Sequence, residues 1–348
     1  MYTGPKKIFI TGAAGYVGAM LADQFSKSPD IEEIIALDKD PMPDLLADNK
    51  KIFWITENLT SNSWMRLVSQ KRPDVVIHCA WQIRDIFGEE DTQKKWNIGG
   101  SSKLFEFVFR EPYIKRIIHF STVSTYGAFE ENTITKKFRE TDRLGEDEYR
   151  YGVEKREVER ILERMYLKSE RNAEVFVIRP GSITGPRARY TVKKKGLLYY
   201  LEHVMPFFPV ANDEWCRQYI HEDDITNIVG MFAFSPLRIK PSFRVYNLAP
   251  ADVVLAEDMA RIFNKKIVKI SPDTVRVIFR LAWNLTLGRI PTSPGGWKFF
   301  CYPIVADGTK ITKEFGYRYL YSALEALTKD EGRYMPELTE EPTKQETV

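Results

Sequence analysis

The segment that most constrains this chain lies near its N-terminus, at Lys6 to Gly18. A run of strand-forming residues, Ile8 to Thr11, is followed by Gly12, Gly15 and Gly18 and then by apolar residues at helical spacing. Such a turn brings backbone N–H groups and a helix N-terminus together, which suits a pyrophosphate group. Glycine is needed where a Cβ would block the turn, a phosphate or the packing of helix on strand. The segment therefore predicts a dinucleotide site.

Segments typical of strands and of helices alternate up to residue 180. We predict strands at 31–38, 51–56, 74–79, 116–122 and 174–179, and helices at 16–26, 64–71, 94–110 and 149–168. This alternation indicates an α/β fold, a doubly wound parallel sheet (Rossmann fold) with a smaller C-terminal substrate-binding region. We expect residues 1–180 to bind the cofactor and 181–329, interleaved with them, mainly the substrate. The polar residues 330–348 are expected to form a flexible tail.

Composition argues against several other classes of protein. With 51 basic and 48 acidic residues the net charge is +3, which gives no strong electrostatic case for a nucleic-acid partner. Cys79, Cys216 and Cys301 are widely spaced and are expected to be free thiols in a reducing compartment. His78 and His119 lie on predicted buried strands and are expected to be satisfied core residues, so no metal site is predicted. With no room for a signal peptide and no apolar run of membrane-spanning length, we expect a cytoplasmic protein.

An acidic residue, Asp38, ends the second predicted strand. At that position a carboxylate can accept hydrogen bonds from the ribose hydroxyls and repel a 2′-phosphate, which favours NAD over NADP. Lys39 follows directly and could soften the repulsion, so NADP is the less favoured alternative. Taken alone, Asp38 could also be an ordinary surface residue at a strand end.

Tyr151 and Lys155 stand four residues apart on a predicted helix and so share one face. An ammonium beside a phenol would lower the pKa of the tyrosine from about 10 and fit it for general acid or base chemistry. The spacing is common by chance, but Thr122 adds support because it follows the fifth predicted strand. Ligands of doubly wound sheets bind at that edge, where the Thr122 hydroxyl could reach a substrate oxygen. The alternative is that Thr122 only satisfies a loop backbone.

Taken in order, these motifs resemble the extended short-chain dehydrogenases/reductases of the NAD-dependent epimerase/dehydratase family, over about residues 6 to 328. The TGxxGxxG of the family stands at Thr11 to Gly18, and Arg179-Pro180 and Gly185-Pro186 match later landmarks. The resemblance implies three catalytic residues, Thr122, Tyr151 and Lys155. It also implies cofactor contacts at Gly12, Ala14, Gly15, Tyr16, Val17, Gly18, Asp38, Asn58, Leu59, Cys79, Ala80, Trp81, Asn97, Tyr151, Lys155 and Pro180.

Several positions bear on the substrate. Asn58 stands where the family has an aspartate and could keep an adenine contact through its amide. Val123-Ser124 replace the Asp-Glu pair of sugar 4,6-dehydratases, so dehydration is not expected. Ser182 replaces an asparagine that is frequent in enzymes acting on uridine-diphospho-sugars, whereas Arg217 matches a position that contacts nucleotide phosphates. The resemblance implies a substrate site with Thr122, Ser124, Ser182 and Arg217.

Three hypotheses about function remain open. The favoured one is an NAD-dependent nucleotide-sugar epimerase in which Tyr151 takes a proton from a substrate hydroxyl as hydride leaves the carbinol carbon. The second is an NAD(P)-dependent dehydrogenase or reductase acting on a more apolar alcohol or ketone, for which Ser182 and the apolar stretch 275–287 argue. The third is a non-catalytic NAD-binding sensor. The presence of Thr122, Tyr151 and Lys155 argues against it.

Two further apolar features invite an interpretation. Residues 275–287 predict a helix packed over a pocket, in the core or at an interface. A helix lying on a membrane surface is the alternative, with Arg276 and Arg280 as its basic residues. Apolar residues within 104–109 and 158–165 suggest a four-helix homodimer interface, as in members of the family.

Overall fold

The computed structural model describes residues 6–169, 173–189, 197–237 and 242–335. Its centre is a seven-stranded sheet with strand order β11-β6-β5-β4-β1-β2-β3 and parallel pairing throughout. The strands are β1 (Lys7–Thr11), β2 (Glu33–Asp38), β3 (Ile52–Thr56), β4 (Val75–His78), β5 (Arg116–Phe120), β6 (Glu174–Pro180) and β11 (Phe243–Leu248). The chain moves outward from β1 on one side and from β4 on the other. The predicted doubly wound sheet is thus confirmed.

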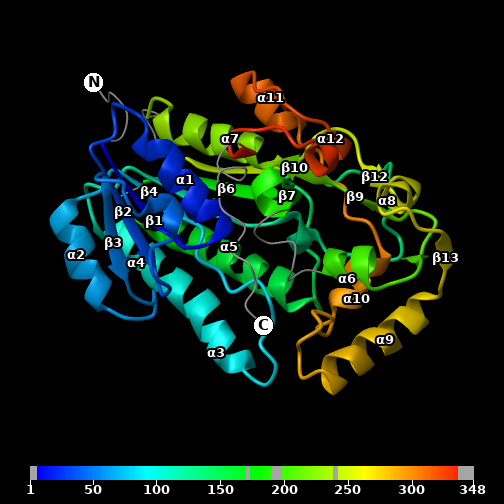
Figure 1. Ribbon diagram of the computed structural model, residues 1–348. Helices are drawn as coiled ribbons and strands as arrows, with labels where there is room; N and C mark the ends of the chain where they lie inside the picture. The colour runs from blue at the N-terminus through cyan, green and yellow to red at the C-terminus, as the bar shows by residue number, and fades with distance from the viewer. Residues whose placement is uncertain (1–5, 170–172, 190–196, 238–241, 336–348) are drawn as a thin grey trace.

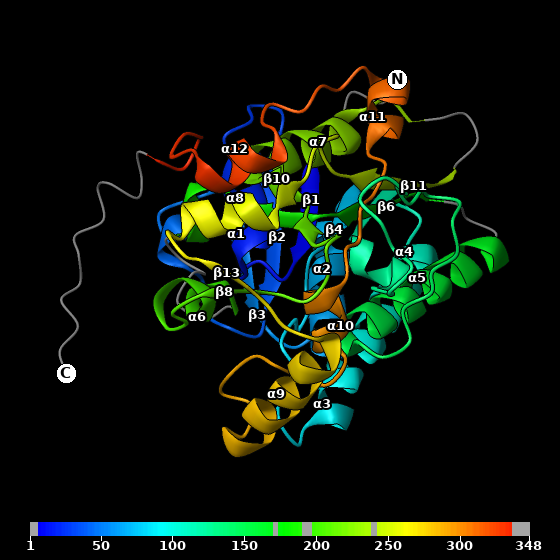
Figure 2. The ribbon, with the colours of Figure 1, turned by 90° about the vertical axis from the view of Figure 1, so that its right-hand side faces the viewer.

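Helices cover both faces of this sheet (Figure 1). One apolar layer joins the strands to α1 (Tyr16–Ser26), α7 (Glu222–Phe234) and α11 (Thr309–Phe315). The other joins them to α2 (Ser63–Lys71), α4 (Gly100–Arg110) and α5 (Arg150–Lys168). In Figure 2 the strands lie between α1 on one side and α4 and α5 on the other. Successive residues of β1, Ile8 and Phe9, enter opposite layers, as the period of two in a strand requires.

The predicted helix at 94–110 is interrupted. It consists of α3 (Glu90–Lys94), a π-helical turn η2 (Lys95–Gly99) and α4. The turn contains the buried Asn97, and π-helical turns are often found at functional sites. The prediction of helix was right, but it missed this widened turn and the start of the helical segment at Glu90.

After β6 the chain builds most of a third apolar cluster, here called the C-terminal cluster, from short elements. Three two-stranded pairs join β7 (Ser182–Thr184) to β10 (Tyr219–His221), β8 (Phe208–Val210) to β13 (Ile267–Lys269) and β9 (Cys216–Arg217) to β12 (Val254–Leu255). The helices here are α6 (Leu197–His203), α8 (Ala256–Ile262), α9 (Pro272–Leu285), α10 (Gly296–Cys301) and α12 (Ala323–Thr328). The elements α7, β11 and α11 return to the sheet. Residues after 180 therefore contribute both to the apolar layers of the sheet and to the C-terminal cluster.

Some residues of the predicted tail and of the predicted dimer interface lie in the described structure. The tail from 330 lies largely outside the described residues, yet Tyr334 is buried and its hydroxyl donates to the Met20 carbonyl oxygen at 2.9 Å. Most of the apolar residues that suggested a homodimer interface lie in the core of the chain itself: Leu104, Phe105, Phe107, Val108, Val158 and Leu162. A homodimer therefore stays a prediction. Across the described ranges, no helix is both long and apolar enough to span a bilayer.

Candidate active site at the carboxyl edge of the sheet

The glycine turn after β1 is shaped by contacts that leave no room for side chains. Gly12 has a φ of 73° and donates its N–H to the Leu37 oxygen at 2.9 Å. A Cβ on Gly12 would lie 2.5 Å from the backbone nitrogen of Ala80, and a Cβ on Gly18 would lie 2.1 Å from the Gly12 oxygen. Gly15 is the N-cap residue of α1. The turn therefore exposes backbone and a helix N-terminus, as a phosphate group requires.

Asp38 at the end of β2 supports this turn. One carboxylate oxygen accepts the N–H of Ala14 at 2.9 Å, and the other accepts the N–H of Asp40 at 3.1 Å. The ammonium of Lys39 pairs with Asp40 at 3.1 Å. The charge of Lys39 is thus matched by Asp40, and the Asp38 carboxylate stands beside the turn where a ribose would lie.

Two predicted cofactor residues turn their side chains elsewhere. The Tyr16 hydroxyl donates to the buried carboxylate of Glu222 at the start of α7, which also accepts the N–H of Arg187 at 3.0 Å. Val17 packs against the apolar layer on that face of the sheet. Both residues keep their backbone in the first turn of α1, so a contribution to cofactor binding would come from the backbone.

Asn58 and Leu59 follow β3 at the same edge of the sheet. The side-chain oxygen of Asn58 accepts the N–H and the hydroxyl of Thr60, each at 2.9 Å, which forms a local turn. Leu59 is buried among the helices of the second layer. The adenine contact expected of Asn58 stays a prediction.

The loop after β4 lies against the glycine turn. Cys79 continues the ladder by donating its N–H to the Thr11 oxygen at 3.1 Å. Asn97 fixes the next residues, because its side chain accepts from the Gln82 N–H at 2.8 Å and donates to the Gln82 oxygen at 3.1 Å. It also donates to Glu154 at 2.7 Å. Asn97 thereby ties this loop to α5.

The three predicted catalytic residues meet where β5 and α5 converge. Thr122 caps the short helix η3 (Val123–Tyr126) by accepting the N–H of Ser124 at 3.2 Å. A Cβ on Gly152 would lie 2.7 Å from the Ser124 oxygen, so the first turn of α5 approaches η3 closely. This approach brings the Tyr151 phenol near Thr122, whose hydroxyl lowers the pKa of Tyr151.

Lys155 is buried one turn after Tyr151, and its ammonium donates to the Phe120 oxygen at 2.5 Å. It also lies 3.7 Å from the ring centroid of Trp81. Burial lowers the pKa of Lys155 to about 7, against an opposing effect of nearby acidic groups, Cys79 first. The indole nitrogen of Trp81 is buried and has no hydrogen-bond partner among the described residues.

The prediction that Lys155 lowers the pKa of Tyr151 was wrong. The pKa of Tyr151 is raised to about 12, because burial disfavours the phenolate and only the Thr122 hydrogen bond opposes that effect. The ammonium of Lys155 is directed at the Phe120 carbonyl and the Trp81 ring instead.

A buried polar network under this site was missed by the sequence analysis. Arg179 and Glu159 form an ion pair at 2.6 Å, and Ser121 donates its hydroxyl to the same carboxylate. Arg179 also donates to the Tyr126 hydroxyl at 2.9 Å, and Pro180 then ends β6. The network joins β5, β6 and α5 at the edge where they carry the site. The one available signal was that Glu159 lies one helical turn beyond Lys155.

A cavity of about 520 Å³ opens between the sheet edge and the C-terminal cluster. Ser182 and Arg217 line it as predicted substrate residues, whereas Thr122 and Ser124 are not among its lining residues. Tyr149 forms part of its wall, and the Tyr149 ring lies 5.9 Å from that of Tyr151. One aromatic ring therefore separates the cavity from the predicted catalytic tyrosine.

Arg217 is one of several charged residues that line this cavity, the others being Arg84, Arg189, Arg289, Asp85 and Glu202. Its guanidinium donates to the carbonyl oxygens of Cys216 at 2.7 Å, Phe299 at 2.6 Å and Phe300 at 2.9 Å. Within the described ranges it forms no ion pair with a carboxylate, and burial lowers its pKa. A half-buried guanidinium held by neutral oxygens and by the rings of Trp215 and Phe299, at 4.5 and 5.1 Å from the ring centroids, can bind an anion.

The rest of the cavity wall is largely apolar. The sequence predicted only part of this wall. The prediction of a helix over a pocket at 275–287 agrees with α9, whose Phe279 and Trp283 line the wall. Other apolar lining residues come from segments without a clear pattern: Leu197, Leu198, Leu201, Trp215, Phe263, Phe299 and Phe300.

The two buried histidines differ from each other. His78 contacts the hydroxyls of Thr11 and Ser101, each at 2.8 Å, and burial lowers its pKa to about 3. His119 stacks on His78 with ring centroids 5.2 Å apart, and burial also lowers its pKa. Neither ring nitrogen of His119 has a hydrogen-bond partner among the described residues. The expectation of satisfied core histidines holds for His78 and fails for His119.

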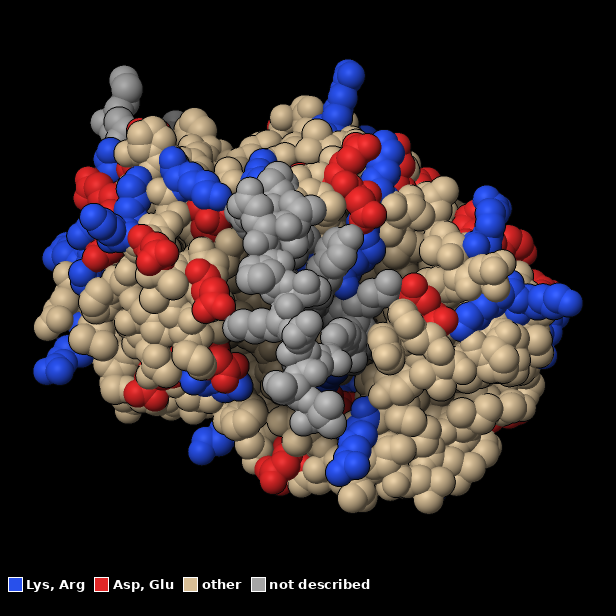
Figure 3. All heavy atoms as spheres, viewed as in Figure 1, with Lys and Arg blue, Asp and Glu red and all other residues tan. Residues whose placement is uncertain are grey.

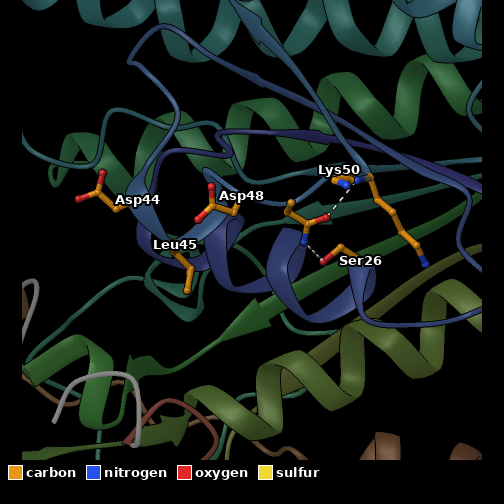
Figure 4. A pocket seen from close by; sticks show the side chains of 7 residues that line it. Ser26, Asp44, Leu45, Asp48 and Lys50 are labelled. Carbon is orange, nitrogen blue, oxygen red and sulfur yellow. Dashed lines mark hydrogen bonds between the residues drawn. The ribbon is translucent and has the colours of Figure 1, made fainter. Parts of the chain in front are cut away.

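A second, open hollow lies at the other end of α1 from the glycine turn (Figure 4). Its lining residues are Ser26, Asp44, Leu45, Asp48, Asn49, Lys50 and Lys51. The Asn49 amide donates to the Ser26 hydroxyl at 2.6 Å. It lies away from the carboxyl edge that carries Tyr151, so we assign it no part in the site.

Residues 8–249 match the model of the family described as "NAD dependent epimerase/dehydratase family". The uncharacterized protein Rv0501 of Mycobacterium tuberculosis is 25% identical over 126 residues, which are 36% of this chain and 34% of that protein. The match thus spans about a third of that relative. A dTDP-D-glucose 4,6-dehydratase of Dictyostelium discoideum is 26% identical over 293 residues, which are 76% of this chain and 62% of that protein.

Solved structures resemble this fold over nearly its whole length. UDP-glucose 4-epimerase of Thermotoga maritima, solved with UDP-glucose, has a TM-score of 0.68 at 20% identity and covers 92% of this chain and 96% of its own. MoeE5, solved with UDP-glucose and NAD, has a TM-score of 0.68 at 17% identity, with 92% and 95% covered. At these identities the likeness establishes the fold alone.

Proposed function

Because the chain belongs to the NAD dependent epimerase/dehydratase family, we propose that it is an NAD-dependent nucleotide-sugar epimerase. The residues fit the cofactor of that family. The turn at Gly12 and Gly18 has no room for a Cβ, and Asp38 stands beside it with an oriented carboxylate. The unpartnered indole nitrogen of Trp81 supports a ligand between this turn and α5.

NAD, when bound, supplies the hydride acceptor for the carbinol carbon of the substrate. In our proposal Tyr151 exchanges the hydroxyl proton of the substrate. Because its pKa is raised to about 12, Tyr151 keeps its own phenolic proton at neutral pH. Its pKa must therefore fall before it can act as a base. Thr122 already lowers the pKa of Tyr151, and we propose that Lys155 turns its ammonium from the Phe120 oxygen toward Tyr151 when ligands bind.

Arg217 is the observation that carries the proposed substrate class. A nucleotide sugar has a diphosphate that would neutralise the guanidinium, while its sugar could extend past Tyr149 toward Tyr151. In this arrangement residues before 180 hold NAD and residues after 180, with Ser182 among them, hold the substrate. Similar folds solved with UDP-glucose are compatible with this assignment. Dehydration is not part of the proposal, since Val123 and Ser124 carry no carboxylate.

A second candidate is a dehydrogenase or reductase for a more apolar alcohol or ketone. The apolar cavity wall formed by residues such as Phe279, Trp283 and Phe300 favours it. In that case Tyr151 would play the same part, but the hydride would stay on the cofactor. No observation in the described residues favours the non-catalytic sensor, and Thr122, Tyr151 and Lys155 are all present.

The first test is mass spectrometry of the purified protein, followed by turnover assays with UDP- and dTDP-sugars. We expect retained NAD, and epimer formation that Tyr151→Phe lowers by about 10³-fold or more while NAD binding persists. Tyr166→Phe, on the same helix, is the matched control and should leave turnover unchanged. Arg217→Met should raise KM for a nucleotide sugar by about tenfold or more.

Each outcome separates the candidates. Turnover that survives Tyr151→Phe contradicts the proposed acid/base residue. Reduction of apolar ketones that is unaffected by Arg217→Met, with no nucleotide sugar turned over, favours the second candidate. NAD binding without any redox change or epimer across both substrate classes favours the sensor.

A further inference from the structure

Helix α9 has two apolar faces. The inner face packs inward through Val275, Phe279 and Trp283, and the last two line the cavity. The opposite face carries four large apolar side chains that expose between 50% and 81% of their area: Val277, Ile278, Leu281 and Leu285. Their spacing of one, four and eight residues places them in one stripe along the helix, here called the outer stripe. Packing within the chain accounts for the inner face and leaves the outer stripe unexplained.

The surface continues beyond the helix in a residue that folding alone does not require to be apolar. Leu287 exposes 66% of its area and has a φ of 51°, in the left-handed region that branched apolar residues avoid. Phe87, from the loop after β4, lies on the inner side of the helix with its ring 5.7 Å from that of Trp283, and Ile83 of the same loop lines the cavity, so neither belongs to the outer stripe. A strained, exposed leucine beside the outer stripe points to a contact outside the chain.

The charges around the outer stripe are basic. Arg276 and Arg280 are exposed and lie one helical turn apart along one side of it, with the Arg276 guanidinium 5.5 Å from the Trp297 ring, while Arg289, after the helix, lines the cavity. The only acidic residue of α9 is Asp273, in its first turn. Figure 3 shows a broad surface with few charged side chains over α9, in the lower right of the view. Apolar residues with a basic border match the boundary between anionic headgroups and acyl chains.

We propose that the outer stripe of α9 docks this protein on an anionic lipid surface. At about 1.5 Å per residue its 14 residues extend about 21 Å, too short to cross an apolar core of about 30 Å, so the helix lies along the interface. A second copy packed antiparallel would bring Arg276 and Arg280 against the same two arginines, whereas anionic headgroups neutralise them. Because the inner face of α9 walls the cavity, docking holds the cavity next to the headgroups. The inference does not depend on the proposed reaction.

The test is co-sedimentation of the full chain with vesicles of phosphatidylcholine alone and of phosphatidylcholine with phosphatidylglycerol. We expect binding to the anionic vesicles that weakens as salt rises. Leu281→Glu and Leu285→Glu should each lower the partition coefficient by about tenfold or more. The matched control is Leu320→Glu, because Leu320 exposes 56% of its area but lies outside α9, and it should not change binding.

Two further variants separate lipid binding from misfolding. Arg280→Gln should lower binding to anionic vesicles by about fivefold and leave binding to neutral vesicles unchanged. Leu287→Asn suits the left-handed backbone, so it should preserve or raise the melting temperature while it weakens vesicle binding. The proposal fails if the unmodified protein stays in the supernatant with anionic vesicles at low salt, or if Leu320→Glu weakens binding as much as Leu281→Glu. A dimer that Leu281→Glu converts to a monomer, without vesicle binding, would assign the stripe to a second copy.

Discussion

Asp38 supports the glycine turn with both of its carboxylate oxygens, which makes Asp38→Asn an informative change. One oxygen accepts from the Ala14 N–H at 2.9 Å and the other from the Asp40 N–H at 3.1 Å. Asparagine has a single carbonyl oxygen, and its amide group is a donor that cannot replace the second acceptor. One of the two backbone N–H groups must therefore lose its partner, although the side chain keeps its size.

The expected cost follows from these two hydrogen bonds. A hydrogen bond to a charged group contributes about 1.5–3 kcal/mol, and the Asp40 bond is solvent-exposed and contributes less. We expect Asp38→Asn to lower the free energy of unfolding of the protein without cofactor by about 1–3 kcal/mol, and the melting temperature by about 1–4 °C. The turn must then be rebuilt when NAD binds, so NAD affinity should fall by about 5- to 150-fold. NADP affinity should fall less, because the charge that repels a 2′-phosphate is gone.

The control is Asp40→Asn, which removes the same charge two residues away. Its side chain pairs with Lys39 at the surface, so we expect a melting temperature within about 1 °C and an NAD affinity within about twofold of the unmodified protein. Calorimetry measures the melting temperature, and titration calorimetry measures the affinities for NAD and NADP. Equal behaviour of the two variants would refute the claim that Asp38 holds the turn. A fall in melting temperature with unchanged NAD affinity would show that this turn does not bind the cofactor.

Two more predictions concern the same edge of the sheet. Gly18→Ala should abolish NAD binding and lower the free energy of unfolding by about 1–3 kcal/mol, because the new Cβ would lie 2.1 Å from the Gly12 oxygen. The control is Gly99→Ala, whose Cβ would meet nothing within 4 Å, and its free energy of unfolding in urea should be unchanged or higher by up to about 1 kcal/mol. Equal losses in the two variants would contradict the close approach at Gly18. The pKa of Lys155 is lowered to about 7 in the folded protein. Between about pH 7 and pH 10 this lysine therefore binds more protons in the unfolded chain than in the folded one. The free energy of unfolding should rise with pH in this range, by up to about 1.4 kcal/mol per pH unit. Lys155→Met should remove this slope in urea titrations across that range, and an unchanged slope would contradict the assignment.

The sheet was predictable because buried parallel strands read as continuous apolar runs. The strand expected at 74–79 appears as β4 at Val75–His78, and its neighbours agree as closely. Helical periodicity located 94–110 but not the π-helical turn within it, because the contact of Asn97 with Glu154 joins residues far apart in the chain. Elements such as β8 at Phe208–Val210 are too short for any period to show.

At the site, spacing predicted which residues meet, while the directions of their side chains depended on distant parts of the chain. Thr122 and Tyr151 lie together as expected. The Tyr16 side chain, in contrast, points to Glu222, and the Lys155 ammonium points to the Phe120 oxygen. The sign of the pKa shift of Tyr151 was missed for the same reason: a sequence places an ammonium one turn away but does not reveal how completely the phenol is buried.

Arg217 separates the two candidate substrate classes more sharply than the shape of the cavity does. The apolar wall could accept either class, since nucleotide sugars also carry apolar ring faces. The guanidinium is half-buried, and three carbonyl oxygens and two aromatic rings offset part of the cost of withdrawing it from water. The diphosphate of a nucleotide sugar would pair with this guanidinium, whereas an apolar ketone would bring no group of opposite charge to it. The charge of Arg217 therefore favours a phosphorylated ligand. The apolar wall would then surround the rest of that ligand and exclude water from it.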